Sequence, residues 1–280
     1  MYPPENEHPH QGFGDLSPQE IRPLIRGVIG SEIRFFHSVA STNVTALDMA
    51  GNVEEGTVVI AESQEHGRGR HGRAWESPPG VNIYMSIILK PRLAPEDAML
   101  MTLMAAVASA DALREHTGLD VRIKWPNDLL VHDKKAGGIL TEMKTEGGRV
   151  VCAVIGIGIN VNTDLSGFPE EIQTEATSVK KELGISVRRT EVVAGILNEL
   201  DRWYRVLCTK RGDRILSEWK RLSATLGKKV LVTIGESTWR GVAESIDKTG
   251  MLVLRLSSGE RRIIHAGDLT HLRDDTAGPP

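Results

Sequence analysis

The feature that most constrains the fold is an apolar segment at residues 150–161, VVCAVIGIGINV, in which glycines alternate with isoleucines near the end. A second apolar-rich stretch at residues 139–144 precedes it, and a Gly-Gly pair at 147–148 lies between them. Two such stretches around paired glycines predict an antiparallel hairpin. Because side chains alternate across a strand, Gly156 and Gly158 leave one of its faces bare. We expect a ligand or another backbone to come close to that face.

Other segments carry the periods of both helices and strands, which predicts an α+β fold. The strongest helix covers residues 95–116, with apolar residues along one side and Gly118 past its end. Alternation over residues 121–125 predicts a half-buried strand in which Lys124 points away from the apolar face. Further strands are predicted at residues 33–37, 57–62 and 82–89, and further helices from Pro18, from about Asn43 to Gly51, from Thr190 to about Leu207 with Thr190 as the N-cap, and over residues 214–222.

The pattern changes after Gly227, where short alternating runs separated by turn residues predict a small all-β barrel. A chain of 280 residues has room for one large domain and such a small one. We therefore predict a disordered tail at residues 1–17, rich in Pro, His, Glu and Gly, and an α+β domain at 18–224. The β-barrel follows at 225–274, and a short tail at 275–280.

Charge and cysteine content exclude several classes of protein. The formal net charge of −3 gives no overall attraction for nucleic acid or anionic lipid, so an anion site needs a local cluster of bases. Cys152 and Cys208 are far apart and lack metal-ligand spacing, which indicates reduced thiols rather than a disulfide or zinc site. The sequence has neither a signal peptide nor an apolar run long enough to cross a bilayer. We expect a cytoplasmic protein without a membrane partner.

A basic cluster lies in the segment GRGRHGR at residues 67–73, with Trp75 just beyond it. Its arginines repel one another, and its glycines lose much conformational entropy when they are ordered. An anion would neutralise the guanidinium groups while the glycines let backbone N–H groups approach it. We expect the loop to be mobile when empty and ordered when filled. The alternatives are a solvated basic turn and a nucleic-acid-binding segment.

Two further clusters place lysines beside turns. The sequence KWPND at residues 124–128 ends a predicted strand with a lysine, a fixed turn and a carboxylate, which suits a phosphate contact beside a metal-bound oxygen. The sequence KAGG at residues 135–138 places another lysine before paired glycines. Each cluster alone has a structural reading as a salt bridge or a turn. Their occurrence together with the arginine loop favours an anion-binding site.

Together these segments resemble the successive signatures of the biotin protein ligase family. The matching strings, in the order of the family, are Ser41-Thr42-Asn43, Gln64, GRGRHGRAW from Gly67, KWPNDL from Lys124, KAGGIL from Lys135 and GIGINV from Gly156. The resemblance spans most of the chain from about residue 33, and it is specific because the related lipoate ligases share the fold but not these strings. It implies a mixed or antiparallel sheet domain of the biotin/lipoate ligase type, with a small C-terminal SH3-like β-barrel.

The resemblance implies that the enzyme uses ATP and Mg²⁺ to convert biotin into biotinyl-5′-AMP. Arg68 and Arg70 would hold the biotin carboxylate and the α-phosphate together, and Lys135 would stabilise charge on the phosphoryl oxygens, so these three are the implied catalytic residues. Asp128 is the implied carboxylate near Mg²⁺. The implied biotin site comprises Ser41, Thr42, Asn43, Gln64, Gly67, Arg68, Gly69, Arg70, Lys135 and Gly138. The implied nucleotide site comprises Arg70, Arg73, Trp75, Lys124, Asn127, Asn160 and Arg273.

Two of these assignments are less direct. Trp75 packs either against the adenine or in the core. The spacing around Arg273 differs by one residue from the pattern of the family.

The resemblance also implies a protein partner, because the biotinyl group passes to a lysine of a biotin carboxyl carrier protein, such as the biotin domain of an acetyl-CoA or pyruvate carboxylase. Only forty residues precede Ser41, so we expect no N-terminal winged helix and no DNA partner. The edge strands of the hairpin sheet could pair in a homodimer.

Two rival functions stay open at this point. A lipoate or octanoate acyltransferase of the same fold would need no partners for a ureido ring. A single-stranded nucleic-acid binder would use the arginine loop, although four phenylalanines and three tyrosines offer few stacking platforms.

Overall fold

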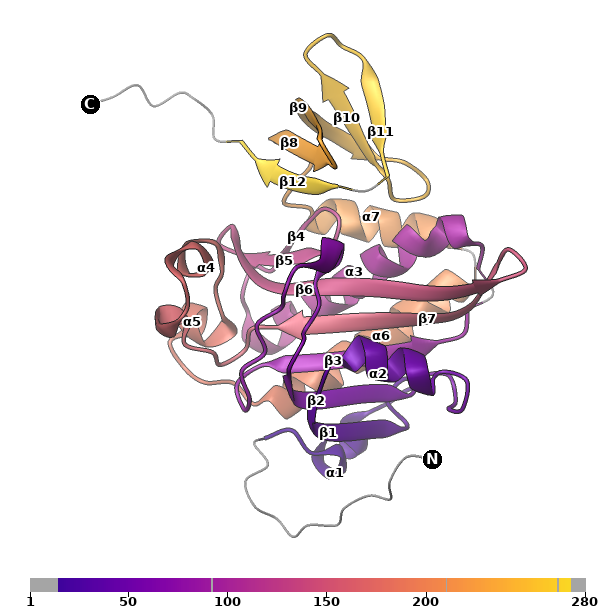
Figure 1. Ribbon diagram of the computed structural model, residues 1–280, viewed down its shortest axis with the longest axis vertical. Coiled ribbons are helices and arrows are strands. Elements are labelled where there is room, and N and C mark those ends of the chain that lie inside the picture. The colour runs from indigo at the N-terminus through magenta and orange to yellow at the C-terminus, as the bar shows by residue number, and fades with distance from the viewer. Residues whose placement is uncertain (1–14, 92, 210, 266, 273–280) are drawn as a thin grey trace.

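The computed structural model describes residues 15–91, 93–209, 211–265 and 267–272. Its larger part contains α1 (Pro18–Ile21), η1 (Arg22–Leu24), β1 (Ile33–Val39), α2 (Thr42–Met49), β2 (Val58–Gln64), η2 (Arg70–Gly72), β3 (Ile83–Leu89), η3 (Pro95–Asp97), α3 (Ala98–Thr117), β4 (Arg122–Lys124), β5 (Asp128–Val131), β6 (Lys134–Glu146), β7 (Arg149–Ile159), η4 (Leu165–Gly167), α4 (Glu170–Glu175), α5 (Val179–Leu183), α6 (Arg189–Cys208) and α7 (Gly212–Leu222). The C-terminal part contains β8 (Lys229–Ile234), β9 (Ser237–Ile246), β10 (Leu252–Leu256), β11 (Arg261–Ile264) and β12 (Asp268–His271) (Figure 1).

The centre of the larger part is a seven-stranded mixed sheet with the order β1-β2-β3-β7-β6-β5-β4. Strands β1 and β2 are parallel, and the other neighbours are antiparallel. The predicted hairpin at its centre is confirmed as β6 and β7, which pair from Gly137 and Ile159 to the turn at Gly147 and Gly148. The α+β class with a mixed sheet is therefore confirmed.

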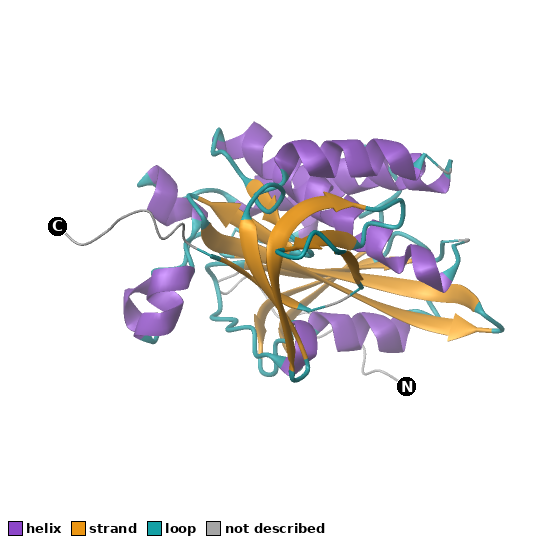
Figure 2. Ribbon diagram, turned by 90° about the horizontal axis from the view of Figure 1, so that it is seen from above, coloured by secondary structure: helices purple, strands orange, loops and turns teal. Residues whose placement is uncertain are grey.

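Helices cover both faces of this sheet (Figure 2). On one face α3, α6 and α7 pack against a core that includes Ile60, Met85 and Ile157. On the other face α2 packs through Ala46 against a smaller apolar cluster that includes Val154. Because side chains alternate along β7, Gly156 and Gly158 lie on the same face as Val154. The bare stretch of the strand is therefore on the side of α2.

The C-terminal strands form a separate five-stranded antiparallel sheet in the order β11-β10-β9-β8-β12. The short alternating runs predicted after Gly227, at residues 230–234, 239–245, 251–256 and 261–265, form β8, β9, β10 and β11, and β12 was not predicted. Trp125 attaches this sheet to the larger part, since its backbone N–H donates to Thr225 Oγ1 at 2.9 Å and its indole N–H donates to Gly250 O at 3.1 Å. The indole is almost fully buried in this joint.

Three details differ from the prediction. Asp15 and Ser17 belong to the described chain and Leu16 between them is fully buried, so packing begins before the predicted boundary at Pro18. The assignment of Thr190 as an N-cap was wrong, because α6 begins at Arg189 and the Thr190 hydroxyl donates to Asp15 O instead. Helices α4 and α5 fill a stretch for which no element was predicted. Residues 1–14 of the expected tail and the tail at 275–280 lie outside the described residues.

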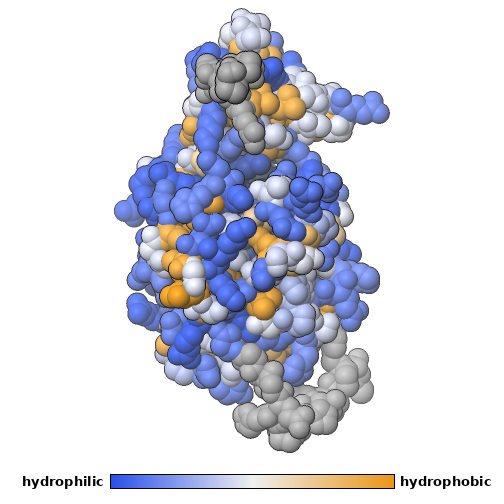
Figure 3. Space-filling model, turned by 90° about the vertical axis from the view of Figure 1, so that its left-hand side faces the viewer, coloured by the Kyte–Doolittle hydropathy of each residue, from blue (hydrophilic) through white to orange (hydrophobic). Residues whose placement is uncertain are grey.

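No helix within the described ranges combines the length and apolar character needed to cross a membrane. The side of the molecule that carries α4 and α5 is mostly hydrophilic, with apolar residues in small groups (Figure 3).

Candidate active site

A cavity of about 1630 Å³ lies on the α2 side of the sheet, below the C-terminal sheet. Its wall is formed by the start of α2, the arginine loop, strands β4 to β7, the segment from Thr163 to Ala176, and β12. Every predicted site residue lines it except Gly67 and Arg273, the latter of which lies outside the described residues. Segments distant in sequence thus meet at one site.

The floor of the cavity includes a row of residues that crosses four strands. Register pairs Gly158 with Gly138, Gly138 with Asp128, and Asp128 with Lys124. Residues paired directly across a sheet point to the same face, and neighbouring strands lie about 4.8 Å apart. The row therefore runs from two bare glycines to a carboxylate and then to a lysine, at spacings set by backbone hydrogen bonds.

The arginine loop folds back on itself as a small hairpin over this row. Gly69 N donates to Arg73 O at 2.7 Å, and Trp75 N donates to Gly67 O at 2.9 Å. His71 at the tip has a positive φ of 54°, in the left-handed region. These contacts define one conformation of the loop. The expectation that it is mobile when empty stays a prediction.

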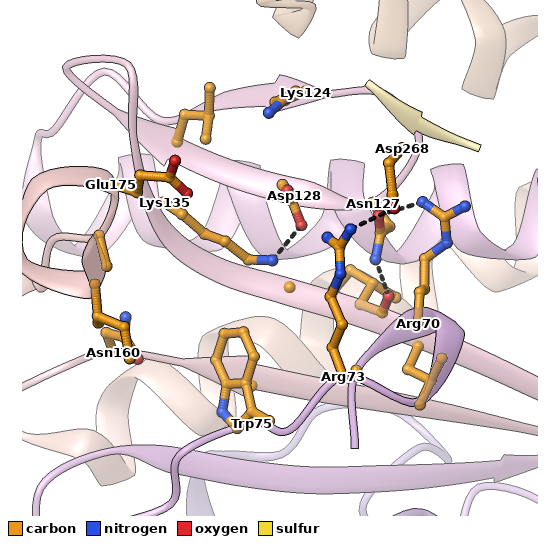
Figure 4. Close-up of a pocket in the computed structure, with 18 of the residues that line it drawn as sticks. Arg70, Arg73, Trp75, Lys124, Asn127, Asp128, Lys135, Asn160, Glu175 and Asp268 are labelled. Atoms are coloured by element: carbon orange, nitrogen blue, oxygen red, sulfur yellow. Dashed lines mark hydrogen bonds and ion pairs between the residues drawn. The ribbon is translucent and has the colours of Figure 1, made fainter. Parts of the chain in front are cut away.

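Arg70 reaches into the cavity, and its guanidinium forms no hydrogen bond with a carboxylate of the described residues (Figure 4). Its guanidinium donates to Asn127 Oδ1 at 3.3 Å and to Gly267 O at 3.1 Å, both neutral acceptors. Burial lowers its pKa from the ordinary value, although nearby Asp268 and Asp128 act in the opposite direction. A partly buried cation held by neutral groups has charge available for an incoming anion.

The other arginines of the loop are more exposed. Arg73 forms an ion pair with Asp268 on β12 and thereby ties the loop to the C-terminal sheet. Arg68 pairs with Ala74 across the hairpin, and its side chain lines the cavity.

Lys135 and Asp128 form an ion pair on the floor, with Nζ and Oδ1 2.6 Å apart. Both side chains are partly exposed, and Lys135 Nζ also lies 5.4 Å from the centroid of the Trp75 ring. Asn160 at the end of β7 is held by a hydrogen bond from its Nδ2 to Thr177 O at 3.1 Å. These groups surround the middle of the row with one carboxylate, one amide and one ammonium group.

Trp75 lies over the bare stretch of the sheet. A methyl group at Gly158 would lie 2.7 Å from Cε2 of Trp75, and one at Gly138 would lie 3.4 Å from Cζ3. Gly158 therefore makes room for the indole, which is part of the cavity wall, whereas a methyl group at Gly138 would only touch the ring. Its Nε1 is buried and has no hydrogen-bond partner among the described residues.

Gly158→Ala should displace this indole, because a Cβ atom cannot stay 2.7 Å from a ring carbon. The family resemblance implies that Trp75 lines a nucleotide site, so the variant should also use the nucleotide less well. We expect KM for ATP to rise about tenfold, the effect of losing roughly 1.4 kcal/mol of binding. Gly51→Ala is the matched control, since a methyl group there meets nothing within 4 Å. Equal KM values for the two variants would show that the position of Trp75 does not matter.

A polar pocket lies at the start of α2. Ser41, Thr42 and Asn43 are each less than 5 % exposed. The backbone N–H of Thr42 donates to Gln64 Oε1 at 2.9 Å, and the Thr42 hydroxyl lies 3.1 Å from the same oxygen. Gln64 Nε2 donates to Ser77 Oγ at 2.9 Å. Buried polar groups at a cavity wall, each held in one orientation, are typical of a site that recognises a mainly apolar ligand.

Several residues that line the cavity or support its walls escaped the sequence analysis. Asp268 comes from β12, which was not predicted, and Glu175 comes from α4, which also lacked a clear pattern. Ser77 supports Gln64 from a loop, with no motif around it. Ser86 had a signal, since it is a polar residue within an otherwise apolar strand, but its partners could not be read from the sequence.

Comparison with known proteins shows to which family the chain belongs. The model of the Biotin/lipoate A/B protein ligase family matches residues 35–160, and that of the Biotin protein ligase C terminal domain matches residues 225–271. The bifunctional ligase/repressor BirA of Bacillus subtilis is 38 % identical over 255 residues, which cover 90 % of this chain and 78 % of BirA. The biotin acetyl-CoA-carboxylase ligase of Paracoccus denitrificans is 34 % identical over 232 residues, covering 82 % of this chain and 96 % of that protein. The chain belongs to the biotin protein ligase family.

A solved structure supports the same assignment. The biotin protein ligase from Aquifex aeolicus, in complex with biotin and ATP, superposes with a TM-score of 0.74 at 26 % identity. The similarity covers 86 % of this chain and 99 % of that one.

Proposed function

We propose that the chain uses ATP to convert biotin into biotinyl-5′-AMP and then transfers biotin to a lysine of a biotin carboxyl carrier protein. The observation that carries the proposal is the cavity itself, which unites a buried polar pocket at Thr42 and Gln64 with the cationic groups Arg70 and Lys135. Biotin has a polar ureido ring at one end and a carboxylate at the other. The two ends of the cavity match these two chemistries.

Biotin would lie with its ureido ring against Thr42 and Gln64, near Ser41. Its carboxylate would extend toward the hairpin loop, where Arg68, Arg70 and the backbone of Gly67 to Gly69 provide donors. Gly138 lies on the floor below this path and lets the ligand approach the backbone.

ATP would bind with its α-phosphate beside the biotin carboxylate. Arg70 would contact both anions and so offset the repulsion between them. Lys135 would stabilise charge on the phosphoryl oxygens as the carboxylate oxygen bonds to phosphorus and pyrophosphate leaves. Arg73, Lys124, Asn127 and Asn160 would contact the nucleotide, and Trp75 would contact the adenine.

Asp128 would contribute to a Mg²⁺ site. Mg²⁺ is commonly held by one or two carboxylates together with phosphate oxygens and water, so a single carboxylate in the phosphate region fits this kind of site. The described residues contain no group of three or more potential His, Cys, Asp or Glu ligands. When bound, the metal would neutralise charge on the phosphates. Asp128 also orients Lys135 through their ion pair.

In the second half-reaction, the neutral amine of the carrier lysine attacks the carbonyl carbon of the anhydride, and AMP leaves with the electron pair of the broken bond. The nitrogen releases one proton to solvent as the amide forms. The hairpin loop would exclude water from the anhydride before this step. The carrier would be the biotin domain of a carboxylase. We also propose a homodimer through the edge of β6 beyond Ile139, since β5 pairs only with residues Lys134 to Gly138 and Asn127 binds both backbone groups of Ile139. Sedimentation analysis tests it.

The deciding experiment incubates the chain with ATP, Mg²⁺ and labelled biotin and analyses the products by mass. We expect biotinyl-AMP, and loss of the product when Mg²⁺ is chelated. Adding a carboxylase biotin domain should move the label to one lysine. Adenylation of lipoate or octanoate but not biotin would instead favour the related acyltransferases. Salt-sensitive retention of single-stranded nucleic acid in filter binding, without adenylate, would favour the nucleic-acid reading.

A further inference from the structure

A buried serine lies directly behind the polar pocket and touches two of its residues. Ser86 on β3 is fully buried, faces Gly156 of β7 in the register of the sheet, and is absent from the cavity wall. Its Oγ lies 2.6 Å from Asn43 Oδ1 and 2.8 Å from Thr42 Oγ1. Any effect of Ser86 on a ligand must therefore pass through these two residues.

The hydrogen bonds of Asn43 fix the direction of its amide. Its Nδ2 donates to Leu140 O at 3.2 Å and to Glu142 Oε2 at 2.8 Å, so both hydrogens of the NH₂ group are used within the protein. The amide thus spans from α2 to β6 across Gly156, where a methyl group would lie 2.2 Å from Oδ1. Asn43 Oδ1 faces Ser86 and can only accept a hydrogen bond there.

This arrangement sets the direction of the hydroxyl hydrogens. A serine hydroxyl has one hydrogen, and Asn43 Oδ1 needs a donor, so the hydrogen of Ser86 goes to Asn43. The hydroxyl oxygens of Ser86 and Thr42 lie 2.8 Å apart and need a hydrogen between them, so the hydrogen of the Thr42 hydroxyl goes to Ser86 rather than to Gln64 Oε1 at 3.1 Å. Thr42 therefore directs only lone pairs toward the cavity.

We infer that Ser86 is a positioning residue that makes Thr42 a hydrogen-bond acceptor and thereby selects a ligand with an N–H group at that place. The ureido ring of biotin has such a group, whereas the dithiolane of lipoate and the alkyl chain of octanoate do not. Asn43 then has a structural role in the pocket wall, because both hydrogens of its amide already bond within the protein. This inference rests on the proposed use of biotin.

A double-mutant cycle with Ser86→Ala and Thr42→Val tests the inference. Ser86→Ala should raise KM for biotin about five- to tenfold, the effect of losing one hydrogen bond of about 1 kcal/mol, and leave kcat and KM for ATP nearly unchanged. In a Thr42→Val background, the same change should have no further effect on KM for biotin. If the two losses multiply, Ser86 does not act through Thr42 and the inference is overturned.

Ser109→Ala is the matched control, because Ser109 is equally buried on α3 and its hydroxyl has no hydrogen-bond partner among the described residues. Its KM for biotin should equal that of the wild type. A fall in kcat and a rise in KM for ATP with Ser86→Ala would indicate general damage to the site and would also overturn the inference. If the wild-type chain forms no biotinyl-AMP, the proposed function itself is contradicted. If the wild type is active but the effects of Ser86→Ala and Thr42→Val on KM for biotin multiply, only the inference about Ser86 is contradicted.

Discussion

Arg70→Ala should form biotinyl-AMP about 10²- to 10³-fold more slowly than the wild type while remaining folded. Removal of one preorganised donor to a developing anion typically has an effect of this size. Arg70 is the cation of the loop that combines partial burial with neutral hydrogen-bond partners, so no ion pair with a described residue neutralises it before the ligands bind. Single-turnover measurement of the adenylate, with a thermal melt beside it, checks both parts of this expectation.

The same variant should also release its intermediate. Without Arg70, the hairpin loses its contacts with Asn127 and Gly267 and closes the cavity less well. Arg149→Ala, at an exposed position at the start of β7, is the control for loss of an arginine. Adenylate formation at the wild-type rate by Arg70→Ala would remove the main support for the proposed chemistry.

Arg189→Met should lower the free energy of unfolding by about 3–5 kcal/mol, the usual effect of removing one partner of a buried ion pair. The Arg189 side chain is fully buried, and its guanidinium donates to Glu62 Oε2 at 2.8 Å and to Glu62 Oε1 at 3.2 Å. It also donates to Asn82 O at 3.0 Å and to Asp15 Oδ1 at 2.6 Å. Methionine would leave the Glu62 carboxylate buried without its counter-ion. Urea denaturation measures the loss.

The neighbouring residue offers a control. Arg188 is 62 % exposed and pairs with Glu20 and Glu191 at the surface, so Arg188→Met should change stability by less than about 1 kcal/mol. Adding Glu62→Leu to Arg189→Met should recover part of the lost stability by removing the unpaired charge. No recovery would mean that packing, rather than the stranded charge, dominates the effect.

The sequence predicted those parts of the fold that have a strong local period. Alternation identified the hairpin of β6 and β7, and an apolar face with Gly118 past its end identified α3. This helix ends at Thr117, and Gly118 is its C-cap with a φ of 71°. Helices α4 and α5 were missed because they are short and present only a narrow buried face, as in α5, where Val179 alone is buried. Their position depends on contacts with distant segments, such as the hydrogen bond from Thr177 N to Lys135 O.

The candidate site divides in the same way. The clusters around Arg70, Asn127 and Lys135 could be found because each combines charge with glycine or proline in one short string. Other site residues are held by partners that lie far away in the chain and have no motif of their own. Asp268 pairs with Arg73, and Ser86 contacts Thr42. Only the register of the sheet reveals that Gly158, Gly138, Asp128 and Lys124 form one row.

The burial of Trp125 between the two sheets has a consequence for protein engineering. Trp125 immediately follows Lys124, the last residue of β4. Its hydrogen bonds with Thr225 and Gly250 connect the end of this strand to residues of the C-terminal part. Cutting the chain after residue 224 would put a large aromatic ring into water and leave its backbone N–H without the Thr225 hydroxyl. The C-terminal sheet thus covers part of the core of the larger domain, and we do not expect it to be removable without loss of stability.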